Sequence, residues 1–161
     1  MMARTVFYSF HYKQDVHRVQ LVEKMGALEG QPILNSQAWE SIQARGETAI
    51  QEWIDGQMKY KRAVVVLIGR YTSQRPWVRY EIEKAWAEKR PLLGIRIHGI
   101  SSMGAVDSPG ASPFDIADVP SASIPVVDPT RRDWVGNIDS KATYNYLAEN
   151  IEAWSGQGTT A

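Results

Sequence analysis

The stretch from residue 63 to residue 97 constrains the fold more than any other part of this sequence, because it alternates apolar, amphipathic and apolar segments. Residues 63–68 read AVVVLI, and residues 92–97 read LLGIRI. Short continuous runs rich in β-branched residues are typical of parallel strands that are buried on both faces of a sheet. Pro76 predicts a helix start between them, since proline fixes φ and lacks the N–H that a first helical turn leaves unpaired. A strand–helix–strand unit is therefore predicted.

One glutamate of this helix has a position that bears on function. Glu81 lies on the flank of the apolar stripe, about one turn into the helix and close to the carboxyl end of the first buried strand, where open α/β sheets bind ligands. The same spacing suits a surface glutamate that pairs with Lys84 or Lys89, and periodicity alone leaves both interpretations open. The apolar stripe itself consists of Val78, Ile82, Ala85 and Trp86.

Strands and helices alternate along the whole chain. This alternation predicts an α/β protein with a three-layer, flavodoxin-like fold around a central, mostly parallel sheet of five strands. Residues 1–161 are expected to form a single domain whose last segment, 155–161, is a frayed tail. The other predicted elements are a strand at 5–10, a helix from an Asp15 N-cap to about residue 28, a short strand at 33–34, a helix at 47–59, a strand at 124–127 and a helix capped by Ser140.

Two stretches are predicted to lack regular structure. Residues 35–46 contain turn formers, the single large aromatic Trp39 and no sustained period, so we expect a functional loop with a helical turn in it. Residues 98–123 are rich in glycine, serine, proline and aspartate. Connections of this length inside a compact domain are usually functional or mobile.

Composition argues against several classes of partner. The 18 acidic and 18 basic side chains leave no net charge, which favours neither nucleic acid nor an anionic membrane as a partner. The absence of cysteine excludes disulfides and thiolate chemistry and fits a reducing compartment. No apolar run approaches the ~20 residues of a membrane span, and the first residues lack the layout of a signal peptide. We therefore expect a soluble, cytoplasmic protein.

Several familiar catalytic motifs are missing. No glycine-rich phosphate loop and no G-x-G-x-x-G turn follows the first predicted strand. The three histidines, His11, His17 and His98, do not have the spacing of metal ligands, so we expect neither a metal site nor a prosthetic group. Ser9, His11 and Asp15 lack the G-x-S-x-G elbow of a nucleophilic serine, and Ser9 is expected to be a hydrogen-bonding residue at a strand end.

Aromatic side chains and one carboxylate are predicted to meet at the carboxyl ends of the strands. Such a combination suits a flat heterocycle attached to a sugar. The rings stack on the heterocycle, and the carboxylate binds sugar hydroxyls or faces an oxocarbenium-like transition state. Trp77 and Phe10 also suit simple packing roles. The predicted lining consists of Ser9, Phe10, His11, Tyr12, Trp39, Arg75, Trp77 and Glu81.

The order of several sequence blocks resembles a known family. VFYSF at 6–10, VVVLIG at 64–69 and above all WVRYE at 77–81 resemble TIR domains. The similarity is closer still to the TIR-like proteins of bacterial Thoeris antiphage defence, the ThsB family, because WIDGQM at 53–58 and LLGIRIH at 92–98 also match that family. Together with SFHY and SPFD, these blocks cover roughly residues 5–115.

The resemblance implies an enzyme that uses NAD+ as substrate. Such an enzyme cleaves the nicotinamide–ribose bond after a phage-derived trigger and forms a cyclic ADP-ribose isomer, a diffusible nucleotide that activates a separate effector. By position, Glu81 corresponds to the catalytic glutamate, and residues 35–46, with Trp39, correspond to a mobile loop that covers the site and mediates self-association. The pocket residues implied by the first strand and its loop are Phe7, Ser9, Phe10, His11 and Tyr12.

Two departures and two alternatives accompany this interpretation. Many TIR enzymes have arginines just after the first strand, where this chain has His11, Tyr12 and Lys13, and beyond residue 115 little of the family pattern is recognisable. The main alternative is a non-enzymatic TIR-like module that binds or scaffolds other proteins through the loop at 35–46. A phosphoacceptor domain of the same fold would need acidic residues at the end of the first strand, where Ser9 stands.

Overall fold

The centre of the protein is a parallel sheet. The computed structural model describes residues 6–11, 15–24, 36–102 and 104–161. Within these ranges the sheet has four strands in the order β1-β2-β3-β4, whereas the sequence predicts five; the strand predicted at 33–34 lies outside the described residues. All neighbouring strands pair in parallel. The strands are β1 (Val6–Ser9), β2 (Ala63–Ile68), β3 (Leu92–Arg96) and β4 (Val126–Val127).

Strand β2 is the middle of the core. It lies between β1 and β3, and every one of its six residues is buried. A strand covered on both faces has no polar side to present, which accounts for the continuous AVVVLI sequence. The prediction of a buried parallel strand at residues 63–68 is confirmed.

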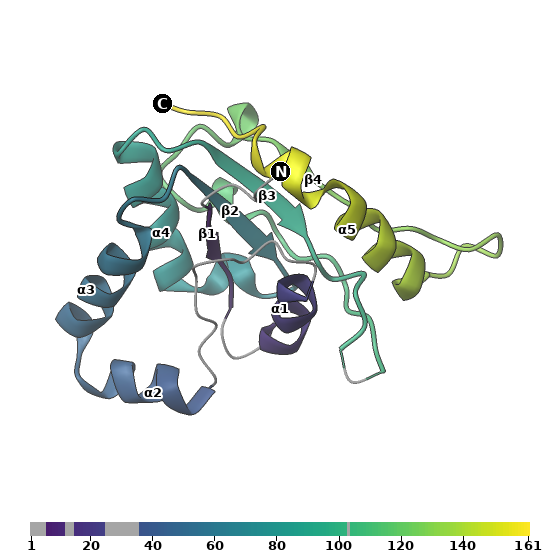
Figure 1. Ribbon diagram of the computed structural model, residues 1–161, viewed down its shortest axis with the longest axis horizontal. Helices are drawn as coiled ribbons and strands as arrows, with labels where there is room; N and C mark the ends of the chain where they lie inside the picture. Colours follow the sequence, from purple (N-terminus) through teal and green to yellow (C-terminus); the bar gives the residue numbers. More distant parts are fainter. Residues whose placement is uncertain (1–5, 12–14, 25–35, 103) are drawn as a thin grey trace.

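Helices cover both faces of this sheet, as Figure 1 shows. Successive side chains of a strand point to opposite faces. In β1, Ser9 hydrogen-bonds Glu81 on α4, whereas the neighbouring Tyr8 hydroxyl lies 3.4 Å from that of Ser155 on α5. Helices α4 and α5 therefore cover opposite faces, and the predicted three-layer α/β fold is confirmed. The helices are α1 (Val16–Glu23), α2 (Ser36–Ala44), α3 (Glu47–Met58), α4 (Pro76–Ala87) and α5 (Ser140–Ser155).

The predicted loop at 35–46 is wrong, because residues 36–44 form α2. This helix buries Trp39 and Ile42, which are three residues apart on one face. The Trp39 ring meets Trp53 of α3 edge to face, with 5.9 Å between the ring centroids. A helix of nine residues is marginal by itself, so we attribute its stability to this tertiary contact, which the sequence period does not reveal.

Both ends of α5 also differ from expectation. The N-cap is Asp139, whose carboxylate accepts from the N–H of Ala142 at 2.9 Å, and Ser140 is the first helical residue. The tail after the helix is not frayed, since Thr159 and Leu92 exchange two backbone hydrogen bonds of 2.8 and 2.9 Å. Pairing with the first residue of β3 satisfies backbone groups that a free tail would leave to water.

The long connection after β3 is ordered by short helical turns. Residues Pro113–Asp115 and Ser121–Ser123 form 3₁₀ helices, and Phe114 in the first of them is almost completely buried. In the described ranges, no helix has both the length and the apolar character that crossing a bilayer requires.

The ordered tail gives a test by glycine substitution. A Cβ on Gly158 would lie 2.9 Å from the backbone nitrogen of Leu92, so Gly158→Ala should lower the free energy of unfolding by about 1–3 kcal/mol. Gly56→Ala in α3, where a Cβ meets nothing within 4 Å, should leave stability unchanged or raise it by about 0.5–1 kcal/mol. Chemical denaturation measures both values, and an unchanged stability of the Gly158 variant would contradict the paired tail.

Candidate active site

A recess with a free volume of about 20 Å³ lies where β1 ends and α4 begins. Small-molecule sites in proteins usually have about 300–1,000 Å³, so the walls of this recess must move apart before a ligand enters. Six of the residues that the sequence predicts for a ligand site meet here, together with Val78. The lining consists of Phe10, His11, Trp39, Arg75, Trp77, Val78 and Glu81.

Helix α4 places Glu81 at the bottom of this recess. The helix begins at Pro76, as the sequence predicts, and the preceding Arg75 is extended. Glu81 follows in the second turn, on the same buried face as Val78 and Ile82, and only 3% of its surface is exposed. The surface interpretation of Glu81 is therefore wrong.

The lysine expected in that surface interpretation has other partners. The Nζ atom of Lys84 lies 2.8 Å from a carboxylate oxygen of Glu88 and 3.4 Å from one of Asp55. Glu88 follows the last turn of α4 and Asp55 lies on α3, so Lys84 forms its ion pairs away from Glu81.

The side chain of Ser9 holds the carboxyl group of Glu81. Its Oγ donates to Oε1 of Glu81 at 2.5 Å, which is within the range of strong O–H···O contacts to carboxylates. Burial raises the pKa of Glu81 to about 8, and the hydrogen bond from Ser9 only partly offsets this effect. Glu81 therefore retains its proton at neutral pH.

Aromatic rings form the side walls. Trp77 meets Tyr80 edge to face with 5.5 Å between the ring centroids, so its orientation is fixed by a neighbour, as that of Trp39 is by Trp53. Phe10 is 2% exposed and His11 8%. Flat aromatic walls around one carboxyl group are suited to holding a planar ring next to a developing positive charge.

Arg75 supplies positive charge to the lining of the recess. It is half-buried and caps the start of α4. None of the ion pairs among the described residues involves its guanidinium. An arginine that is not neutralised by a carboxylate offers planar, paired donors to phosphate oxygens.

Three predicted pocket residues have a different place, and one of them, Ser9, does not line the recess but hydrogen-bonds Glu81. Phe7 lies on β1 with no exposed surface and does not line the recess, so it is a core residue of the face that α4 covers. Tyr12 lies outside the described residues. Sequence reasoning assigned Val78 to the core alone, although its position one turn before Glu81 on the same helix face could have placed it at the site.

The described residues contain no group of three histidine, aspartate or glutamate side chains that could hold a metal ion. The site offers one buried carboxyl group, a serine hydroxyl, aromatic walls and an arginine.

Comparison with known proteins finds a matching family model and a related protein. The family model described as "Thoeris protein ThsB, TIR-like domain" matches residues 7–102, which is more than half of the chain. A protein of Bacillus cereus (strain MSX-D12), named "Putative cyclic ADP-D-ribose synthase ThsB1", is 34% identical over 121 residues. This alignment covers 71% of the present chain and 62% of the relative, so the chain spans less than two thirds of the length of that protein.

The matched residues 7–102 include β1, β2, β3 and α4, and with them Ser9 and Glu81. The W-V-R-Y-E sequence that resembles TIR domains is the first part of α4, and it places its glutamate at the floor of the recess. The chain therefore belongs to the TIR-like domain family of the Thoeris protein ThsB.

Proposed function

We propose that this protein cleaves the nicotinamide–ribose bond of NAD+ and closes the remaining ADP-ribose into a cyclic isomer. The observation that carries the proposal is the buried carboxyl group of Glu81 in an aromatic recess at the carboxyl edge of a parallel sheet. The name of the Bacillus cereus relative, "Putative cyclic ADP-D-ribose synthase ThsB1", supports the same reaction.

The recess suits one end of the substrate. Its aromatic lining suits the nicotinamide ring and the attached ribose, which would enter as the walls move apart. The walls formed by Trp39 and Trp77 would pack against the ring, and Arg75 would face the pyrophosphate that follows the ribose. The adenosine end would then lie outside the recess.

Glu81 would act on the bond that breaks. When that bond breaks, its electron pair goes to the ring nitrogen, neutral nicotinamide leaves, and positive charge develops on the ribose. A carboxylate in a site with little water stabilises this charge strongly. The cationic nicotinamide ring of the bound substrate would lower the pKa of Glu81, which promotes release of its proton.

Exclusion of water would favour ring closure over hydrolysis. The reactive ribose carbon needs a nucleophile, and in a narrow recess a group of the same ADP-ribose competes well with water. The new bond closes the ring, and the proton of the attacking group, where it has one, passes to the carboxylate of Glu81. The cyclic product would diffuse to a separate effector, and a phage-derived trigger would set the rate.

Self-association remains part of this proposal. Its predicted surface, residues 35–46, contains helix α2, which buries Trp39 and exposes Glu40, Ser41 and Gln43. Contact between copies of the chain would therefore use this polar side. The scaffold alternative differs in one respect that is easily measured, because a scaffold releases no nicotinamide under any condition of assembly.

The first test replaces the carboxyl group. Glu81→Gln keeps the volume and an oxygen that can accept from Ser9, but it removes the negative charge, so nicotinamide release should fall by about 10²–10³-fold. Purified protein is incubated with NAD+, alone and with phage lysate, and the products are identified by mass spectrometry. Glu83→Gln on the solvent side of the same helix is the matched control and should retain activity. Equal rates in the two variants would rule out the assigned role of Glu81.

The pH dependence of the reaction is a second test. If the carboxylate is the acting form, kcat/KM rises with pH until the group is deprotonated in the free enzyme, near pH 8. Initial rates of nicotinamide release between pH 6 and 9 measure the midpoint. A rate that is flat over this range would mean that the acting group is another one.

Stability gives a test that needs no substrate. The folded protein retains the proton of Glu81 up to about pH 8, while the unfolded chain releases it near pH 4.5. Because the folded state binds more protons in this window, the free energy of unfolding falls as pH rises, by on the order of 3–5 kcal/mol. Glu81→Gln should remove this slope, so that the variant matches the wild type at low pH and exceeds it at pH 8. Parallel stability curves would contradict the buried, protonated state.

A further inference from the structure

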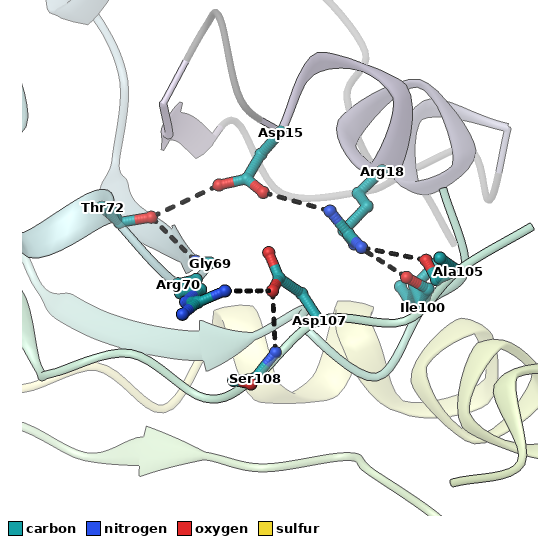
Figure 2. A network of polar contacts seen from close by, with 9 residues as sticks. All are labelled: Asp15, Arg18, Gly69, Arg70, Thr72, Ile100, Ala105, Asp107 and Ser108. Atoms are coloured by element: carbon teal, nitrogen blue, oxygen red, sulfur yellow. Dashed lines mark hydrogen bonds and ion pairs between the residues drawn. The ribbon is translucent and has the colours of Figure 1, made fainter. Parts of the chain in front are cut away.

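A buried polar cluster lies where α1 begins and β2 ends, as Figure 2 shows. Its central members are Asp15, Arg18 and Thr72, which are 1%, 5% and 0% exposed. The sequence predicts Asp15 as the N-cap of α1, but its side chain makes no capping hydrogen bond and points instead toward the end of β2. The cluster therefore needs another explanation than helix capping.

Asp15 packs directly on the backbone that follows β2. Its Oδ2 accepts from the hydroxyl of Thr72 at 3.5 Å, and that hydroxyl in turn accepts from the N–H of Gly69 at 2.7 Å. A Cβ on Gly69 would overlap the carboxylate of Asp15, so glycine is required for this approach. Burial raises the pKa of Asp15 to about 6, although Arg18 lies 3.5 Å away and opposes the shift.

The pair formed by Asp15 and Thr72 joins the two chain segments that flank the recess. On one side, the N–H of Asp15 donates to the carbonyl of His11 at 2.9 Å, and His11 lines the recess. On the other side, the carbonyl of Thr72 accepts from the N–H of Arg75 at 3.2 Å, and Arg75 is the residue from which α4 begins. A single contact thus connects the end of β1 to the start of the Glu81 helix.

Arg18 connects the same contact to the segment after β3. Its Nε donates to the carbonyl of Ile100 at 2.7 Å, and a terminal nitrogen donates to that of Ala105 at 3.1 Å. A buried ion pair of this kind is weak evidence for a role in stability, because the cost of removing both charges from water often cancels their attraction. Oδ1 of Asp15 even lacks a hydrogen bond among the described residues.

We propose that Asp15 and Thr72 are positioning residues that hold the two walls of the recess around Glu81 and keep water from its carboxyl group. Neither residue lines the recess itself. Their catalytic effect rests on the proposed NAD+ cleavage, but their effect on the environment of Glu81 does not. The two effects can therefore be measured separately.

The chain offers a matched pair of variants. Thr72→Val keeps the shape of the side chain and removes its hydroxyl. Thr143 on α5 is also 0% exposed, and its hydroxyl likewise accepts from a backbone N–H, that of Arg131 at 2.9 Å, and donates to an oxygen, the carbonyl of Asp139 at 2.8 Å. Thr143→Val should therefore cost similar stability on the opposite face of the sheet, away from the recess.

The first measurement is the titration of Glu81 by carboxyl ¹³C NMR in protein without substrate, with Glu81→Gln assigning the signal. In Thr72→Val, water should reach the recess and the pKa of Glu81 should fall from about 8 toward 4.5. Thr143→Val should titrate as the wild type does, and Thr72→Ser, which restores the hydroxyl, should return the midpoint. An unchanged midpoint in Thr72→Val, or an equal shift in Thr143→Val, would overturn the proposal.

The second measurement is kinetic. Misplaced walls should lower kcat for NAD+ cleavage in Thr72→Val by about 10- to 100-fold per folded molecule, with a smaller change in KM, while Thr143→Val keeps the wild-type kcat. If the wild type cleaves no NAD+ at all, the proposed function fails while the titration still decides the role of the pair. A normal kcat in Thr72→Val together with a normal titration would refute both parts of the inference.

A second variant covers the case in which Thr72→Val does not fold. Asp15→Ala removes the carboxylate that accepts from the Thr72 hydroxyl, and with it the contact between the two segments. The expected results are the same fall in the pKa of Glu81 and the same loss of kcat. Wild-type behaviour of this variant in both measurements would also overturn the proposal.

Discussion

The short contact between Ser9 and Glu81 is the interaction on which the site depends. A carboxyl group with 3% of its surface exposed is held against a single serine hydroxyl, and no cation neutralises it among the described ion pairs. Such a group is stable only as the neutral acid until a positive charge arrives. The same burial that suppresses the anion makes it a strong partner for a cation, because little solvent screens the attraction.

Ser9 and Glu81 meet because successive side chains of a strand point to opposite faces of the sheet. Ser9 and Tyr8 are neighbours on β1, and one faces α4 while the other faces α5. A shift of β1 by one residue against β2 would move Ser9 to the wrong face and remove the only described hydrogen-bond partner of Glu81. The register between β1 and β2 therefore places Ser9 next to Glu81, and the complete burial of β2 fixes that register.

Local sequence patterns predicted the helices and strands whose formation depends on residues close together in the chain. Strand β2 and helices α3 and α4 follow from apolar runs, helical spacing and Pro76, and Glu81 follows from its place on that helix. Helix α2, the paired tail at Thr159 and the buried Asp15 depend on partners far along the chain. Phe7 and Ser9 lie on the same face of β1, and they differ in their distance from the recess. A sequence period predicts the face of a strand on which a residue lies, but not this distance.

The pairing of Leu92 with Thr159 has a consequence for how the domain can be built into longer polypeptides. Leu92 is the first residue of β3, so the last helix leads the chain back to the amino edge of the sheet, the edge at which β1 also starts. The recess opens at the opposite edge, because parallel strands end there together. Polypeptide attached after the paired segment would leave the domain on the side remote from the recess, and the mouth of the recess would stay open.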